Sequence, residues 1–132
     1  MGWKVCAACV GAVLVARAQM ELPTISPEDA LRRMKDTTVV WLDVRTPPEF
    51  AEGFIPGARL IPLQELPARL AELQSLRSKT FIVYCRSGNR SARATALLRA
   101  RGFHAVNMRG GIREWLQKGY PVVFPEPTEK KP

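Results

Sequence analysis

The sequence predicts an α/β fold in which a central parallel sheet of about five strands has helices on both faces. Two apolar runs rich in β-branched residues, 38–44 and 80–84, lack polar alternation, which is typical of strands buried on both faces. Segments with helical periodicity alternate with the expected strands, and this order favours a parallel sheet. The 132 residues, 46% of them hydrophobic, suffice for one domain with its own core.

The first helix of the expected domain has clear start signals. Ser26 is a suitable N-cap, Pro27 takes the first helical position, and acidic residues follow in the first turn. We expect this helix to extend to about Lys35, before the strand at 38–44. The elements expected next are a helical turn at 47–51, a turn at 55–57, a short strand at 58–61 and an amphipathic helix at 63–73.

The second half begins with the buried strand at 80–84, which stops directly before Cys85. After a polar loop, the segment 91–101 is rich in alanine and leucine and predicts a helix, with Gly102 as its C-terminal stop. The remaining elements are a short strand at 105–108 and a helix that follows Gly110-Gly111 and continues through Trp115 to Lys118.

The N-terminal residues 1–18 have the pattern of a secretory signal peptide. A basic start precedes an apolar run, and Ala16-Arg17-Ala18 matches a small-residue cleavage site. The run is shorter than the roughly 20 residues of a membrane span. We therefore expect a periplasmic domain at 19–123 with no stable membrane insertion after cleavage, followed by a disordered Pro/Lys tail at 124–132. The alternative is a membrane anchor formed by an uncleaved N-terminus.

The chain is basic, with 20 lysines and arginines against 12 acidic residues and a net charge of +8. Such a charge suits a phosphate backbone, an anionic lipid surface or a small anion. The basic residues are scattered and are not interleaved with aromatic residues, so we expect no nucleic-acid partner. The oligomeric state stays open.

Signal cleavage would remove Cys6 and Cys9 and leave Cys85 as the only thiol. A lone cysteine in an exported protein forms no internal disulfide, so it is either a buried inert thiol or a reactive one. Cys85 opens the polar loop between a buried strand and a helix, where sheets of this kind bind ligands. Its position therefore favours the reactive thiol.

The composition of the loop also favours a thiolate. The amides of a tight turn and the positive end of the next helix both lower the pKa of a thiol, and Arg86 and Arg90 add positive charge. Gly88 and Asn89 are the residues best suited to the positive backbone angles that such a turn needs. The loop thus predicts a nucleophilic sulfur in a small anion-binding turn.

The loop from Cys85 to Arg90 resembles the active-site loop of single-domain rhodaneses, which begins with the persulfide-forming cysteine. The segment from Asp43 to Pro62 and the Gly110-Gly111 pair with Trp115 are similar to two further motifs of that family. The resemblance covers about 25–121 and implies the rhodanese-like three-layer fold. Phe54 departs from it, since the family often has histidine there; we expect this change to affect packing and not the reaction.

The resemblance implies a thiosulfate sulfurtransferase with ping-pong chemistry. Cys85 would take a sulfane sulfur from a small anionic donor such as thiosulfate, carry it as a persulfide, and pass it to cyanide or a thiol acceptor, with no metal or organic cofactor. Asp43 and Arg45 would support the site, the first by binding loop amides and the second by pairing with Glu49. The residues expected to bind the substrate are Arg86, Ser87, Gly88, Asn89 and Arg90.

Three alternatives remain. The chain could be a periplasmic sulfur carrier for a protein partner or a non-catalytic rhodanese-like binding module. It could also be a cysteine-dependent phosphatase or arsenate reductase, although those enzymes have a Cys-x5-Arg loop, whereas Cys85 and Arg90 form Cys-x4-Arg. The shorter loop suits a single sulfur atom and is too tight for a phosphoryl group. The sequence does not identify the physiological donor or acceptor.

Overall fold

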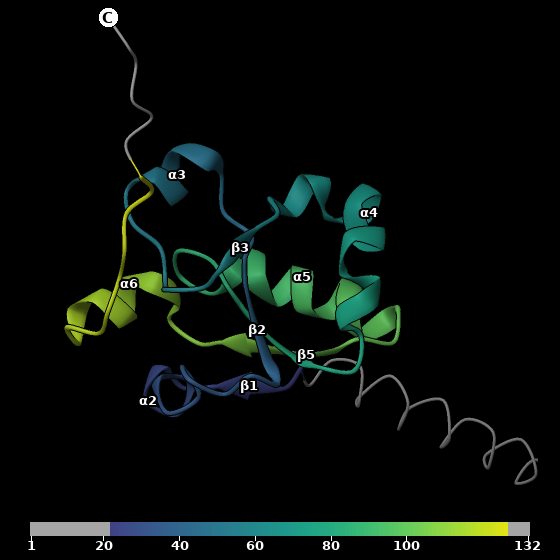
Figure 1. The fold of residues 1–132 in the computed structure, drawn as a ribbon, viewed down its shortest axis with the longest axis horizontal. Helices are drawn as coiled ribbons and strands as arrows, with labels where there is room; N and C mark the ends of the chain where they lie inside the picture. Colours follow the sequence, from purple (N-terminus) through teal and green to yellow (C-terminus); the bar gives the residue numbers. More distant parts are fainter. Residues whose placement is uncertain (1–21, 127–132) are drawn as a thin grey trace, which may run out of the picture.

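A computed structural model describes residues 22–126, so the expected signal peptide at 1–18 and residues 127–132 of the expected tail lie outside it. One sheet with only parallel pairings runs through the molecule (Figure 1). Its strands, in the order β1-β5-β4-β2-β3, are β1 (Thr24–Ile25), β5 (His104–Met108), β4 (Thr80–Tyr84), β2 (Val39–Asp43) and β3 (Arg59–Leu60). The predicted parallel sheet of about five strands is confirmed; β1, which pairs with β5, was not predicted.

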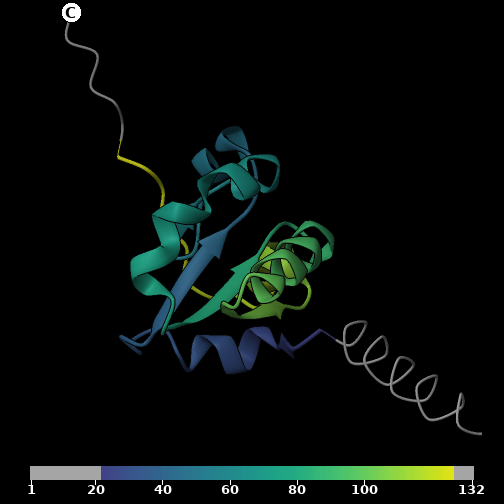
Figure 2. The ribbon, with the colours of Figure 1, turned by 90° about the vertical axis from the view of Figure 1, so that its right-hand side faces the viewer.

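Helices cover both faces of the sheet (Figure 2). One face packs on α4 (Leu66–Arg69) and α5 (Asn89–Ala100), and the other on α2 (Pro27–Leu31) and α6 (Gly111–Gln117). The remaining helical elements are α3 (Pro47–Ala51) and the 3₁₀ helices η1 (Leu63–Glu65) and η2 (Leu70–Leu76). The predicted three-layer arrangement is therefore confirmed.

The two central strands contribute alternate side chains to the two cores. In β4, Phe81 and Val83 belong to the core under α5, whereas Ile82 and Tyr84 belong to the core under α6. All four side chains are fully buried, because both faces of this strand are covered. This double burial explains the lack of polar alternation in the sequence.

Two predicted helices differ from the observed ones. The Ser26 hydroxyl accepts a bond from the Asp29 amide, as expected of an N-cap, but α2 ends at Leu31 and the chain then continues in turns. The single helix predicted at 63–73 is divided into η1, α4 and η2. Pro67 has no amide hydrogen and cannot bond to the carbonyl of residue 63, so the α-helical part begins only at Leu66.

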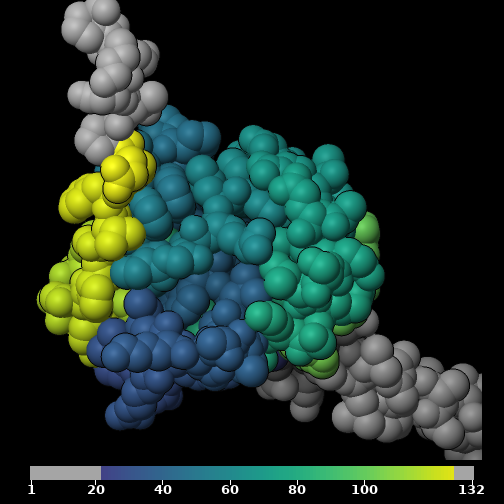
Figure 3. Space-filling view, in the orientation of Figure 1, coloured from purple at the N-terminus to yellow at the C-terminus, as the bar shows by residue number. Residues whose placement is uncertain are grey.

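The segment after α6 returns across the loop that follows α3 (Figure 3). Phe54 and Val123 exchange two backbone hydrogen bonds, each 2.8 Å long, and the Trp115 indole donates to the Pro121 carbonyl at 2.7 Å. Phe54 also stacks on Phe50 with ring centroids 4.0 Å apart, so its side chain serves local packing. Within residues 22–126, no helix is both long and apolar enough to cross a membrane.

Gly111 at the start of α6 is predicted to be essential for the packing of α6 against the Cys85 loop. It has a φ of 60°, and a side-chain carbon there would overlap the carbonyl groups of Cys85 and Arg86. Gly119 has a similar φ of 74° but has open space around it. Gly119→Ala should cost about 1 kcal/mol of unfolding free energy from backbone strain alone, and Gly111→Ala about 2 kcal/mol more.

Urea unfolding of the two variants and the wild type measures this difference. Because both substitutions place alanine at a positive φ, the comparison isolates the overlap with the loop. Equal losses of stability in the two variants would contradict the role given to Gly111.

Candidate active site

The polar loop lies at the edge of the sheet where the parallel strands end. β4 ends at Tyr84, Cys85 follows directly, and α5 begins at Asn89. Asp43 is paired with Tyr84 in the sheet register and ends β2 at the same edge. The loop, the end of β2 and the end of β5 therefore meet where parallel sheets of this class bind ligands.

The sulfur of Cys85 accepts hydrogen bonds from the last residue of the loop and from the first turn of α5. The Gly88 amide donates to Sγ at 3.1 Å, and Ser91 donates its amide at 3.4 Å and its hydroxyl at 3.3 Å. Gly88 has the predicted positive φ, 110°, which turns its amide inward. The same prediction was wrong for Asn89, because this residue already begins α5 and has no positive φ.

The carbonyl groups of the loop bond in other directions. Ile112 and Arg113, in the first turn of α6, donate their amides to the carbonyls of Cys85 and Arg86 at 2.9 and 3.0 Å. The Asn107 side chain donates to the Gly88 carbonyl at 3.2 Å. These bonds satisfy the carbonyl oxygens of the loop, while the amide of Gly88 binds the sulfur.

Cys85 is only 1% exposed, so a negative charge on its sulfur needs specific hydrogen-bond donors. Burial is the largest effect and raises the pKa of the thiol. Hydrogen bonds from the Ser91 hydroxyl and amide and from the Gly88 and Ser87 amides outweigh it, so the pKa lies below its ordinary value. The site therefore stabilises a buried thiolate mainly with neutral donors.

Ser91 and Asn107 are parts of the site that the sequence analysis did not identify. The Ser91 hydroxyl lies 2.6 Å from Asn107 Oδ1 and 3.3 Å from the sulfur, and both side chains are buried. Asn107 is a polar residue inside the apolar strand β5, and that exception to the pattern is the signal by which it could have been found.

Arg90 pairs with Glu49 of α3. Its two terminal nitrogens each donate to one carboxylate oxygen at 2.8 Å, which is a bidentate ion pair. This contact with Arg90 lowers the pKa of Glu49 to about 2, so the pair stays ionised at neutral pH. It also raises the pKa of Arg90, with a smaller contribution from the Cys85 charge. Arg90 is thus near the sulfur but already has an anionic partner.

The predicted partner of Arg45 was wrong. Its guanidinium pairs with the buried carboxylate of Asp43 at 2.7 Å and touches Glu49 only through the backbone carbonyl. Asp43 accepts a bond from the Arg45 amide, and Arg45 also donates to the Gly53 carbonyl at 2.8 Å. The Glu49 carboxylate instead forms an ion pair with Arg90 at 2.8 Å. The Asp43–Arg45 pair therefore ties the end of β2 to the middle of α3 and to the segment directly after it.

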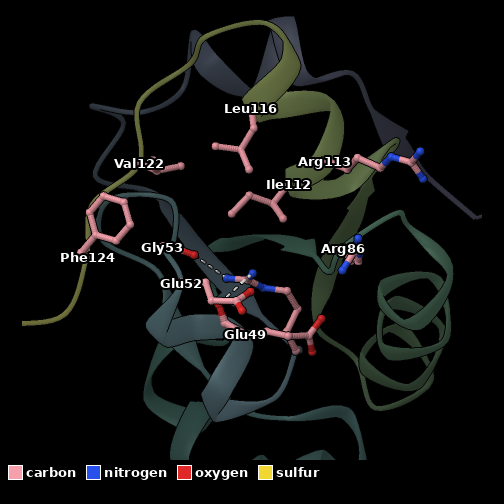
Figure 4. A pocket seen from close by; sticks show the side chains of 10 residues that line it. Glu49, Glu52, Gly53, Arg86, Ile112, Arg113, Leu116, Val122 and Phe124 are labelled. Carbon is pink, nitrogen blue, oxygen red and sulfur yellow. Dashed lines mark hydrogen bonds between the residues drawn. The ribbon is translucent and has the colours of Figure 1, made fainter.

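The other three loop residues expected to bind the substrate are exposed. They are Arg86, Ser87 and Asn89. Among residues 22–126, Arg86 has no salt-bridge partner, and its side chain lines a pocket of about 310 Å³ beside the loop (Figure 4). In the same part of the chain, histidine, cysteine and acidic residues form no cluster that could hold a metal ion.

Comparison with known proteins relates this chain to one domain family. The family model of the rhodanese-like domain matches residues 26–118. A sulfurtransferase of Allochromatium vinosum is 41% identical over 104 residues, which cover 77% of this chain and 95% of that protein. The human thiosulfate:glutathione sulfurtransferase is 34% identical over 109 residues, which cover 73% of this chain and 95% of that protein.

A solved structure has a similar fold. The crystal structure of a rhodanese-related protein from Thermoplasma volcanium superposes with a TM-score of 0.73 and 37% identity. The match covers 78% of this chain and 99% of that one. The similarity thus extends over nearly all of that protein.

Removing the Ser91 hydroxyl is expected to raise the pKa of the Cys85 thiol. Ser91→Ala deletes a donor to the charged sulfur and leaves the amide donors in place. Alkylation by iodoacetamide, followed against pH, should shift to higher pH in the variant, and its rate at neutral pH should fall severalfold. Thr95→Val is the control, because the Thr95 hydroxyl bonds to the Ser91 carbonyl and not to the sulfur. An unshifted profile in Ser91→Ala would contradict the assigned role of the hydroxyl.

Proposed function

Because this chain belongs to the rhodanese-like domain family, we propose that it is a thiosulfate sulfurtransferase that carries sulfane sulfur as a persulfide on Cys85. The observation that carries the proposal is the convergence of Gly88 and Ser91 donors on a single buried cysteine sulfur. The two relatives named as sulfurtransferases, at 41% and 34% identity, support the same class of reaction.

In the first half-reaction, the Cys85 thiolate attacks the outer sulfur of thiosulfate. A bond forms between Sγ and that sulfur, the sulfur–sulfur bond of thiosulfate breaks, and its electron pair leaves with sulfite. The negative charge then lies on the outer sulfur of the persulfide. The loop amides of Ser87 and Gly88 are suited to stabilise that charge, because they are neutral donors that already lower the pKa of Cys85.

In the second half-reaction, cyanide or a thiolate attacks the outer sulfur of the persulfide. The new bond forms to the acceptor, the bond to Sγ breaks, and the thiolate of Cys85 is restored. The net change is the movement of one neutral sulfur atom, so neither step needs an oxidant or a reductant. The low pKa of Cys85 makes it a good leaving group in this step.

The two loop arginines have different tasks in this proposal. Arg86 is exposed and has no salt bridge to the residues at 22–126, so it is the cation available to attract the dianionic donor. Arg90 is paired with Glu49 and contributes mainly by fixing α3 against the loop. The same pairing argues against a phosphatase, since such enzymes use the arginine of the loop to bind the phosphoryl oxygens.

Thiosulfate-to-cyanide transfer by the domain tests the proposal directly. The wild type should produce thiocyanate, and Cys85→Ser should lower turnover at least about a thousandfold, because the serine hydroxyl cannot form the persulfide. An aryl phosphate assayed in parallel should not be hydrolysed. Persulfide formation is followed separately, as the added mass of one sulfur on the intact protein.

The outcomes separate the alternatives. A persulfide without thiocyanate would point to a sulfur carrier, and neither product from a protein with a reactive thiol would point to a binding module. Cysteine-dependent release of phosphate would replace the proposal with a phosphatase.

Neutralising Glu49 is expected to strengthen the binding of the donor. Glu49→Gln removes a negative charge beside the loop and frees Arg90, so the KM for thiosulfate should fall about two- to fivefold. The KM should also become more sensitive to salt, since an unpaired arginine then takes part in binding. Initial rates at several ionic strengths measure both effects.

Glu52→Gln is the matched control, because Glu52 lines the same pocket but forms no ion pair with any residue from 22 to 126. It removes the same charge without releasing Arg90 and should change the KM less. A KM that rises in Glu49→Gln, or falls equally in both variants, would contradict the account of Arg90.

A further inference from the structure

The pocket beside the Cys85 loop has one apolar wall and one cationic edge (Figure 4). The apolar wall consists of Ile112, Leu116, Val122 and Phe124. In Figure 4, Arg86 and Arg113 lie on the right, away from Val122 and Phe124, and Ile112 and Leu116 lie between the two groups. A pocket with this distribution favours a ligand that has an apolar body and an anionic group.

Exposed apolar surface is concentrated at this place. Among the residues described, 22–126, the large hydrophobic side chains with high exposure are Leu116 (52%), Val123 (39%) and Phe124 (67%). Two of them line the pocket, and Val123 lies between two lining residues of the chain. Exposed apolar side chains that gather at one site are typical of a binding surface.

The apolar wall is held in place before any ligand binds. Phe54 fixes Val123 through two backbone bonds, and Trp115 fixes Pro121. The Phe124 ring packs against Gly53, where a side-chain carbon would lie only 3.3 Å from the ring. A wall fixed at these points loses little conformational freedom on binding, which favours affinity.

The charges of the pocket leave two cations available. Arg45 and Glu49 also line the pocket, but both are already in ion pairs. Arg45 pairs with Asp43, and Glu49 pairs with Arg90. Arg86 and Arg113 form no salt bridge within the described range, whereas Glu52 is the unpaired acidic side chain of the lining. The pocket therefore has a net attraction for an anionic group such as a carboxylate.

The pocket borders the loop that would hold the persulfide, and Arg86 is the loop residue that lines it. Arg86 follows Cys85 directly, and the Ile112 amide bonds to the Cys85 carbonyl at 2.9 Å. A ligand in the pocket thus lies against Arg86, which is next to Cys85 in sequence, and against Ile112, which is bonded to the Cys85 backbone. This position suits the second substrate of a sulfur transfer.

We propose that the pocket binds the sulfur acceptor, and that this acceptor is a small thiol with an apolar chain and a carboxylate. The inference rests on the proposed sulfurtransferase function. The acceptor thiolate attacks the outer sulfur of the Cys85 persulfide, forms a new sulfur–sulfur bond and releases the Cys85 thiolate. The apolar chain lies along the Leu116 and Phe124 side of the pocket, and the carboxylate pairs with Arg113 or Arg86.

The test compares thiols of similar basicity as acceptors. Protein loaded with one sulfur is mixed with 6-mercaptohexanoate, 3-mercaptopropionate, 6-mercaptohexanol or cyanide, and loss of the sulfur is followed by intact mass. The second-order rate constant with 6-mercaptohexanoate should exceed those with the short acid and the alcohol about tenfold, because only it has both chain and charge. Equal rates for the three thiols would overturn the inference.

Two pocket variants and one control locate the effect. Leu116→Gln should lower the preference for 6-mercaptohexanoate over 3-mercaptopropionate. Arg113→Gln should lower the preference for 6-mercaptohexanoate over 6-mercaptohexanol. Each rate is measured relative to the same variant's rate with cyanide. Arg101→Gln removes the same charge beyond the far end of α5 and should keep both preferences. Preferences that survive in both pocket variants would place the acceptor elsewhere.

A binding measurement separates this inference from the proposed function. The thioether 6-(methylthio)hexanoate cannot accept sulfur, and it should shift the amide resonances of Arg113, Leu116 and Phe124 in the unloaded protein. Shifts without any persulfide formation would refute the sulfurtransferase and with it the acceptor role. Persulfide transfer to cyanide without shifts or thiol preference would retain the enzyme and overturn the pocket.

Discussion

The structure around the site depends on one constraint: the sulfur of Cys85, a residue that is only 1% exposed, is stabilised as an anion. Burial alone opposes that charge, so donors must surround the sulfur and every nearby carbonyl must face elsewhere. The amides of Ile112 and Arg113 and the side chain of Asn107 meet the second requirement by binding the loop carbonyls. The positions of α6 and β5 are therefore as necessary to the thiolate as the loop itself.

This constraint extends to the elements that do not touch the sulfur. The loop borders Glu49 of α3 through Arg90, and α3 is tied to the end of β2 by the buried Arg45, whose guanidinium reaches Asp43 and the Gly53 carbonyl. A buried ion pair contributes little net stability, but it leaves few alternative arrangements when each partner is fully bonded. The Asp43–Arg45 pair thus serves to position α3 and, through it, the arginine at the end of the loop.

Most of the fold could be predicted from the sequence because local pattern and burial agree there. The strands β2 and β4 are continuous apolar runs, and Cys85 and Gly88 stand out by residue type and place. The strand β1 was missed because its two residues are too few to show a pattern, and their pairing with β5 is a long-range contact. Arg90 and Glu49 are 41 positions apart, so only the tertiary structure reveals that Glu49 pairs with Arg90 and not with Arg45.

The hydroxyl of Ser91 has one proton and two acceptors, Asn107 Oδ1 at 2.6 Å and the Cys85 sulfur at 3.3 Å. It cannot donate to both, so the two acceptors compete for it. While Cys85 is a neutral thiol, the Ser91 hydroxyl donates its proton in the shorter bond to Asn107 Oδ1. When the sulfur becomes an anion, it is the stronger acceptor, and the hydroxyl turns to donate to the sulfur. In the proposed reaction, each transfer that charges and discharges the sulfur would also rotate this buried hydroxyl. The free energy of that rotation would then enter the equilibrium between the empty and the sulfur-loaded protein.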